Sequence, residues 1–400
     1  AGPRTGLGRS GLLVAEVGLS LMLLIGAGLL FRSFLAIQSV EPGYTTERLA
    51  SFGLVLPAAR YETPDQKVQF FERLDQELAA LPGVESVARV IGLPLQGQTL
   101  FSSFTRTDQP PPEPGRDLTS LIRYADEDYF TTMRIPLLAG RGIEATDRHG
   151  SAPVVLLSQA AAAEFFPNEA PIGKQLDFDL SVGYREEQPR TIVGIVADVR
   201  SRGITTEPVP EMYIPLAQAG PSWSTFVIRT TGAASAVLRP ARAVLSSLDP
   251  NLPMGDVATM QDRLSDDLAR PRFMLLLVGL FASLAVVLAG VGIYGVVAFL
   301  VSRRTREIGL RMALGASTRD VVRFVLQYGL KPAAFGVVIG LGTTLLGARV
   351  LQDQLYAVQP QDPLTIGAVC LAMLGVATLA CLLPARRALR VPPATALRSE

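Results

Sequence analysis

Four long apolar runs divide the chain into parts of different character. They cover residues 11–31, 273–301, 329–351 and 364–383. A helix needs about 20 apolar residues to cross the hydrocarbon core of a bilayer, so each run predicts a transmembrane helix. The second run holds 29 residues without a charge, which is about 43 Å of helix at about 1.5 Å per residue. That length exceeds the bilayer core and predicts a stalk.

The first run has an alternative interpretation as a secretory signal peptide, because Arg4 and Arg9 precede it. Its 21 residues exceed the usual apolar region of a signal peptide. The stretch Phe31-Arg32-Ser33-Phe34 also lacks the small residues of a cleavage site. We therefore expect a retained helix.

Charge is distributed unevenly along the chain. Residues 33–271 carry 21 Lys and Arg and 30 Asp and Glu, a net charge of −9, and the other residues carry 16 and 6, a net charge of +10. Basic residues gather in 302–328 and after residue 383, whereas 352–363 has none. The positive-inside rule then places 302–328 and both termini in the cytoplasm and the acidic block outside. Basic flanks beside apolar runs argue for a membrane protein and against a nucleic-acid binder.

The acidic block alternates between strand and helix patterns. Thr63-Pro64-Asp65-Gln66 predicts a helix start, with a capping hydroxyl and a proline in the first turn. We expect strands at 49–56, 84–91, 154–157, 191–196, 225–229 and near Met254, and helices from Thr63, from Ser158 and near 233–248. The first pattern returns after Tyr213, which predicts one α+β lobe that is split in sequence, with a second lobe inserted.

The predicted fold class is an α+β membrane protein with four transmembrane helices. A large two-lobed α+β domain is inserted between the first and second helices. The expected order is a cytoplasmic segment 1–10, helix 11–31, the domain 32–272 (split lobe about 32–120 and 206–272, inserted lobe about 121–205), helix and stalk 273–301, cytoplasmic loop 302–328, helix 329–351, outer loop 352–363, helix 364–383 and cytoplasmic tail 384–400.

Small residues and one carboxylate interrupt the apolar runs. The small residues permit close approach of helix backbones, either within the chain or at a mobile dimer seam. An intramembrane carboxylate is a functional candidate, but Glu16 lies near the cytoplasmic end, where it reaches the interface and favours a structural role. The glycines are Gly290, Gly292 and Gly295 in the second run and Gly336 and Gly340 in the third.

No motif predicts catalysis or a metal site. Residues 92–99 match a phosphate loop except that Gln98 replaces the lysine that would reach the phosphates. His149 is the only histidine and has no neighbouring cysteine, so it is a poor start for a zinc site. The acidic triplet 126–128 is predicted to be a solvated turn. We expect no catalytic residue, no metal and no cofactor bound by this chain.

The segment after the second run is the most informative. It reads Arg303-Arg-Thr-Arg-Glu-Ile-Gly-Leu-Arg-Met-Ala-Leu-Gly-Ala316. Ile308 and Met312 start an apolar stripe among charged residues, which predicts a short interfacial helix. A basic juxtamembrane anchor is the alternative.

This segment resembles the signature of FtsX-like permeases, the membrane subunits of MacB-type ABC transporters. Leu12–Ser20 is similar to the family's first helix, Glu164–Lys174 and Ile192–Arg200 to its periplasmic core domain, and Pro384–Arg398 to its C-terminal ending. The closest likeness is to the C-terminal half of the duplicated orphan permeases of Acidobacteria and relatives. A single four-helix permease is the alternative.

The resemblance implies a coupling helix that docks on a separate cytosolic ABC ATPase, which holds the ATP. It implies a second permease half (an identical chain or a fused copy), contact with membrane lipid, a periplasmic adaptor as an optional partner, and a multi-pass position in the bacterial inner membrane. The coupling residues carried over are Arg304, Arg306, Glu307, Ile308, Gly309, Leu310, Arg311, Ala313, Leu314 and Gly315.

Three functions stay open. A transporter would export or extrude a substrate by mechanotransmission, and the scarcity of intramembrane charges agrees with a route outside the helices. A regulator would use the same motion to control an outer enzyme such as a cell-wall hydrolase. An orphan sensor or scaffold would have no ATPase.

Overall fold

The computed structural model of the chain describes residues 4–97, 100–110, 117–178, 188–304, 307, 310–311, 317–352 and 355–388. Side chains are described from Gly11 onward, except at 348–352 and 388. The chain divides into two compact units. The helical unit comprises Ala1–Ser39 and Arg270–Glu400, and the sheet unit comprises Val40–Ala269.

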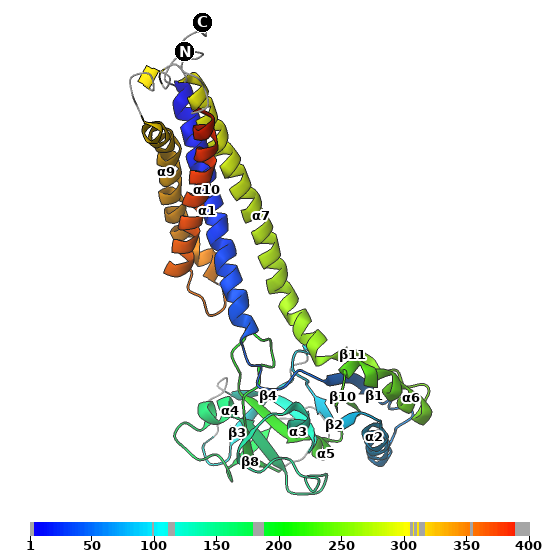
Figure 1. Ribbon diagram of the computed structural model, residues 1–400. Coiled ribbons are helices and arrows are strands. Elements are labelled where there is room, and N and C mark those ends of the chain that lie inside the picture. The colour runs from blue at the N-terminus through cyan, green and yellow to red at the C-terminus, as the bar shows by residue number, and fades with distance from the viewer. Residues whose placement is uncertain are drawn as a thin grey trace. The chain divides into compact units, whose positions relative to one another are not determined.

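Four helices in this part of the chain are long and apolar enough to cross a membrane. They are α1 (Arg4–Gln38), α7 (Met260–Arg303), α9 (Thr318–Gln352) and α10 (Pro363–Ala388) (Figure 1). The first ten residues of α7 belong to the sheet unit and the rest to the helical unit. The four helices and the mixed α+β sheet unit confirm the predicted fold class.

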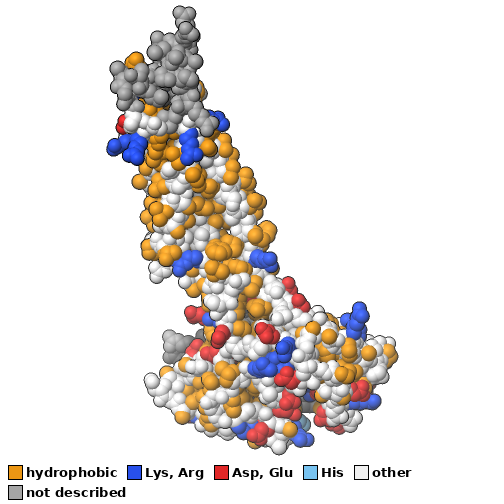
Figure 2. All heavy atoms as spheres, viewed as in Figure 1, with side chains coloured by type: hydrophobic (Ala, Val, Ile, Leu, Met, Phe, Trp, Pro, Cys, Tyr) orange, Lys and Arg blue, Asp and Glu red, His pale blue; other side chains and the backbone are white. Residues whose placement is uncertain are grey.

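One helix lies at the centre of the helical unit. Buried side chains of α1 recur every four residues, at Leu13, Val17, Leu21, Ile25 and Leu29, and so form one stripe. This stripe belongs to an apolar cluster with side chains of α7, α9 and α10. On the face that Figure 2 shows, the surface of the unit is mainly apolar and uncharged, with Lys and Arg near its two ends. That distribution fits helices in a bilayer.

The first and last parts of the sheet unit form one lobe. Its elements are β1 (Leu49–Val55), α2 (Pro64–Ala79), β2 (Val84–Ile91), β10 (Trp223–Thr230), α6 (Leu238–Leu248) and β11 (Gly255–Thr259). The strand order is β11-β1-β10-β2, and all neighbours are antiparallel. This is the pattern of two interlocked split β-α-β units. The predicted strands and helices are confirmed here.

The start of α2 shows why the sequence predicts this lobe well. The Thr63 side chain accepts a hydrogen bond from the Gln66 amide, and the Gln66 side chain accepts one from the Thr63 amide. This reciprocal cap fixes the first turn. The helix then buries Phe71 and Leu74 in a cluster with Phe226 of β10.

The middle of the sheet unit continues the same sheet and closes on itself. Its elements are β3 (Leu100–Arg106), β4 (Leu118–Ala125), α3 (Tyr129–Met133), β5 (Leu137–Gly140), β6 (Val154–Ser158), α4 (Gln159–Phe165), β7 (Gln175–Phe178), β8 (Arg190–Val196), β9 (Glu211–Pro215) and α5 (Leu216–Ala219). Beyond β2 the order is β4-β3-β7-β8-β6-β9, and β4 also pairs with β9 in parallel. These six strands therefore form a closed ring around an apolar core.

Candidate functional site

Four of the ten predicted coupling residues fall within the described part of the chain. They are Arg304, Glu307, Leu310 and Arg311. The other six, Arg306, Ile308, Gly309, Ala313, Leu314 and Gly315, lie outside it.

Glu307 contacts Arg304 and Arg311, the two predicted coupling arginines that the structure describes. Its carboxylate accepts a hydrogen bond of 2.7 Å from Arg311 and lies 3.7 Å from the Arg304 guanidinium. The spacings of three and four residues are those of neighbours on one helical face. Glu307 therefore brings the Arg304 and Arg311 guanidinium groups to one carboxylate.

The same two arginines fasten the segment to the first turns of α9. The Arg304 guanidinium donates a 2.9 Å hydrogen bond to the Tyr328 hydroxyl, and that of Arg311 lies 4.7 Å from the centre of the Phe324 ring. The two rings meet edge to face, with centroids 5.1 Å apart. Cation–π contacts of this kind hold a guanidinium in place.

Leu310 has the opposite environment. Its side chain is 52% exposed although it is apolar. The adjacent Arg311 contacts Phe324 of α9. An exposed apolar side chain with charged side chains near it is suited to contact with a partner protein.

The predicted glycines of α9 pack within the chain. A methyl group added at Gly336 would lie 2.7 Å from Cβ of Val17, and one at Gly340 would lie 2.8 Å from the Gly18 carbonyl oxygen. Both distances are too short for a side chain, so the backbones of α1 and α9 touch directly. Gly18 completes this seam. Sequence reasoning missed it because nothing in the first run shows which helix it faces.

The predicted glycines of α7 have three different surroundings. A methyl group added at Gly290 would make ordinary contact with Val376 of α10. One added at Gly292 would lie 2.5 Å from the Glu16 carboxylate, so this glycine leaves room for that side chain. Gly295 has no atom within 4 Å of that position among the described residues. Only this last glycine faces open space.

Glu16 lies at the contact between α1 and α7. Its carboxylate faces Gly292, and no described side chain forms an ion pair with it. One turn further, the Ser20 hydroxyl lies within hydrogen-bond distance of the carbonyl oxygens of Glu16 and Ala285, at 2.7 and 2.9 Å. A buried polar side chain thus links the two helices in the apolar region.

The rest of α7 is poorly covered. In the most apolar window of each helix, 11% of α7 is buried, against 44% of α1. Large exposed side chains follow one another along it, including Leu276, Leu280, Leu284, Val287, Leu288 and Val291. This surface is available to lipid or to a second copy of the helical unit.

The acidic turn of the sheet unit corrects one prediction. Glu127 and Asp128 are exposed, but Asp126 is buried, and its carboxylate accepts a 2.5 Å hydrogen bond from the Arg89 amide. Arg89 also forms a 2.8 Å ion pair with Asp75 of α2. The prediction of a solvated turn is therefore wrong for Asp126. It failed because the strand β4 ends one residue earlier and carries this side chain inward.

Asp126 is buried and Asp75 is half-buried, so both carboxyls are harder to ionise than in water. Loss of hydration raises the pKa of Asp126 well above its ordinary value and raises that of Asp75 to about 6. One guanidinium, that of Arg89, faces both. Within the described residues, no group of three or more His, Cys, Asp or Glu is placed to hold a metal ion.

Two family models match most of the chain. The MacB-like periplasmic core domain matches residues 11–241, and the C-terminal region of FtsX-like permeases matches residues 279–393.

Named relatives cover the chain to different extents. The macrolide export ATP-binding/permease protein MacB of Chromobacterium violaceum is 26% identical over 296 residues, which is 71% of this chain and 44% of that protein. The pyoverdine export ATP-binding/permease protein PvdT of Pseudomonas syringae is 22% identical over 408 residues, 99% of this chain and 57% of that protein. The uncharacterized ABC transporter permease YknZ of Bacillus subtilis is 22% identical over 338 residues, which is 82% of this chain and 79% of that protein. The chain spans about half the length of MacB and PvdT.

Proposed function

The chain belongs to the family of permeases that combine a MacB-like periplasmic core domain with an FtsX-like C-terminal region, and we propose that it is the membrane subunit of an ABC exporter driven by a separate cytosolic ATPase. The ATPase binds the segment around Arg304–Arg311. Nucleotide-driven closure of the ATPase moves this segment, and the helices carry the motion to the sheet unit. The sheet unit then moves or releases a substrate outside the membrane.

The observation that carries this proposal is the state of the coupling segment. Glu307, Phe324 and Tyr328 hold the two arginines, and Leu310 is left exposed. Because Arg304 and Arg311 contact α9, a force on this segment is transmitted to that helix. A basic anchor without such contacts would not transmit it. The charge pattern supports a cytoplasmic position for this segment and for both termini.

The exposed face of α7 supports a second permease half. A helix with only 11% of its apolar window buried contacts either lipid or another protein along most of its length. In the proposed assembly an identical chain or a fused copy covers part of this face. The sheet unit lies in the periplasm of a bacterial cell, and a periplasmic adaptor is a further partner.

The relatives name two cargoes, a macrolide and pyoverdine, which belong to those proteins. For this chain we propose export as the reaction class and leave the cargo to experiment. A regulator of a periplasmic enzyme shares the same coupling step and differs only in the outer partner.

The test replaces the exposed apolar contact. We expect Leu310→Asp to abolish co-purification of an ABC ATPase with the tagged chain from native membranes, and to abolish stimulation of ATP hydrolysis by the complex. Leu138→Asp, at a comparably exposed position of the sheet unit, is the matched control and should leave both intact. Equal ATPase recovery with Leu310→Asp would refute the coupling assignment.

A further inference from the structure

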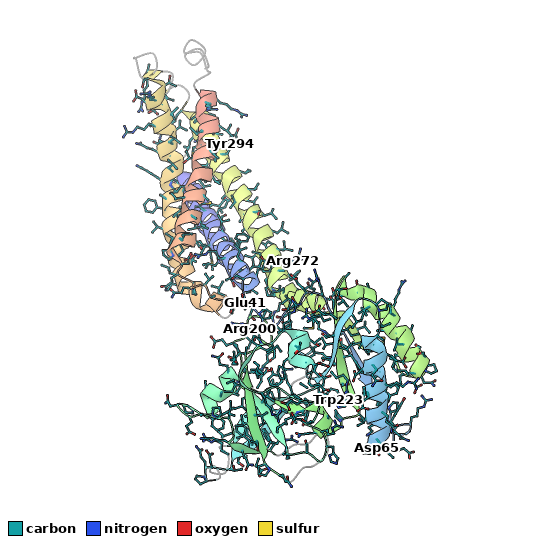
Figure 3. The ribbon with its side chains drawn as sticks, turned by 60° about the horizontal axis from the view of Figure 1, so that its bottom comes forward. Glu41, Asp65, Arg200, Trp223, Arg272 and Tyr294 are labelled. Carbon is teal, nitrogen blue, oxygen red and sulfur yellow. The ribbon has the colours of Figure 1, made fainter. Side chains whose placement is uncertain are left out.

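The segment 198–206, between β8 and β9, contacts the incoming chain of the sheet unit. The chain enters this unit at Val40, and the Arg200 amide donates a 2.9 Å hydrogen bond to the Pro42 carbonyl oxygen. Glu41 and Arg200 lie near each other in Figure 3. Gly43 has a φ of +85° and packs its backbone on Asp198, where a side chain would collide with the Asp198 carbonyl. The incoming chain therefore has a fixed seat on this segment.

The same segment holds the outgoing helix. The Ile204 amide donates a 2.8 Å hydrogen bond to the carboxylate of Asp267, in the part of α7 that belongs to the sheet unit. Ile204 is itself buried. One apolar cluster contains side chains of all three parts: Tyr44 of the incoming chain, Val199 of the segment and Met260, the first residue of α7. The incoming chain and the outgoing helix are thus both attached to one short stretch of chain.

The Arg200 side chain links the start of this stretch to its end. Its guanidinium donates hydrogen bonds to the carbonyl oxygens of Ile204 (3.3 Å) and Thr206 (2.7 Å). These bonds close the loop between the contact with Pro42 and the contact with Asp267. A displacement at one contact therefore reaches the other through a braced loop.

A buried polar chain leads from this loop into the sheet. The Ser201 hydroxyl bonds to the carboxylate of Glu211, which forms a fully buried ion pair of 2.8 Å with Arg123. Arg123 lies on β4 and Glu211 on β9, the two strands whose pairing closes the ring. The Tyr213 hydroxyl donates to the same carboxylate at 3.0 Å. The loop is therefore anchored at the closing seam of the ring.

We infer that residues 198–206 form a clasp that couples the incoming chain to the outgoing helix and transmits their displacement to the β4–β9 seam. Asp267 and Ser201 are its positioning residues. The role in transmission rests on the proposed function, whereas the coupling inside the sheet unit does not. Through the clasp, the incoming chain and the outgoing helix respond to a displacement as one element.

The first experiment measures amide hydrogen exchange in the full chain in lipid nanodiscs. Asp267→Ala removes the acceptor of the Ile204 amide, and we expect exchange there to rise about tenfold, the factor that corresponds to about 1.4 kcal/mol. The clasp further requires that the Arg200 amide, which bonds to Pro42 and not to Asp267, also exchanges faster. Asp267→Asn keeps an acceptor and should restore both.

Asp266→Ala is the matched control, because Asp266 is the exposed neighbour on the same helix. Faster exchange at Ile204 alone, or at neither amide, in the Asp267→Ala chain would overturn the clasp. So would an equal response to Asp266→Ala, since the effect would then come from helix charge. Trp223 is the only tryptophan and lies in the sheet unit, so its fluorescence checks that each variant is folded.

The second experiment separates the clasp from the proposed function. It uses the chain with its co-purified ATPase and compares exchange in 198–206 with and without a non-hydrolysable ATP analogue. The clasp predicts a nucleotide-dependent change that Asp267→Ala removes while ATPase binding stays intact. A nucleotide-dependent change that survives Asp267→Ala would overturn the clasp and leave the proposed function in place.

Discussion

The interior of the sheet unit and the interior of the helical unit are stabilised by different interactions. In the sheet unit, the ion pair of Arg123 and Glu211, both at most 1% exposed, joins two strands that close a ring. In the helical unit, α1 and α9 meet through the backbones of Gly18, Gly336 and Gly340. The hydrophobic effect favours burial of apolar side chains in the sheet unit. In a bilayer it does not favour contact between helices, so the helical unit depends on close packing of small residues.

The difference shows where each unit tolerates movement. The polar connections of the sheet unit have fixed partners, and breaking one leaves a buried charge. The helical unit combines the tight α1–α9 pair with α7, of which little is buried. Under the proposed function, α1 and α9 form a rigid pair and α7 is the helix with freedom to shift.

The largest effect is expected from the buried ion pair. Arg123→Met leaves the Glu211 carboxylate buried without its cation, and we expect the free energy of unfolding to fall by about 3–5 kcal/mol. Urea unfolding of the full chain in detergent, followed by Trp223 fluorescence, measures it. The double variant Arg123→Met/Glu211→Leu should recover most of the loss. A loss below about 1 kcal/mol would fit an exposed pair instead.

The next largest effect tests the glycine seam. Gly336→Leu inserts a side chain where α1 and α9 touch, and we expect a loss of about 1–3 kcal/mol, as overpacking usually costs. Gly295→Leu on α7 enters open space and should change stability little. Thermal unfolding by circular dichroism in detergent compares the two variants. Equal midpoints would show that α1 and α9 are not in close contact.

A smaller effect distinguishes the units by pH. The pKa of Asp75 is about 6 in the folded chain and about 3.9 when unfolded, so between these values the folded state binds more protons. The free energy of unfolding of the sheet unit should therefore decrease as the pH rises from about 4 to above 6. Asp75→Asn should flatten this slope, and Glu72→Gln, at an exposed position of the same helix, should not. Stability of wild type that rises over this range would contradict the assignment.

The smallest effect concerns the coupling segment. Arg311→Ala removes the contact with Phe324 and the bond to Glu307, and we expect a local loss of about 0.5–1 kcal/mol. Hydrogen exchange of the first turns of α9 should increase by a few-fold, with the sheet unit unchanged. Arg319→Ala, at an exposed position of α9, serves as the control.

Periodicity and caps predicted the elements because those signals are local. The apolar runs, the Thr63 cap and the strands 84–91 and 191–196 are each read within a few residues. The β4–β9 pairing joins residues about 90 positions apart, and nothing local announces it. The inward turn of Asp126 and the Gly18 partner of α9 depend on the same kind of distant packing.

The candidate site was less predictable than the fold. The motif around Arg304–Arg311 predicts a coupling segment. The aromatic pair on α9 that contacts its arginines, Phe324 and Tyr328, lies more than ten residues further along the chain and has no sequence signature. The clasp has none either, because most of its hydrogen bonds have a backbone amide or carbonyl at one end. Side-chain patterns are silent about such contacts.

The most direct test of the account places a photo-crosslinker at Leu310 in native membranes, with Leu138 as the control position. We predict capture of a cytosolic ABC ATPase at Leu310 and none at Leu138. Capture of only lipid or of the chain's own C-terminal tail at Leu310, in cells that express such ATPases, would contradict the account and favour an orphan sensor.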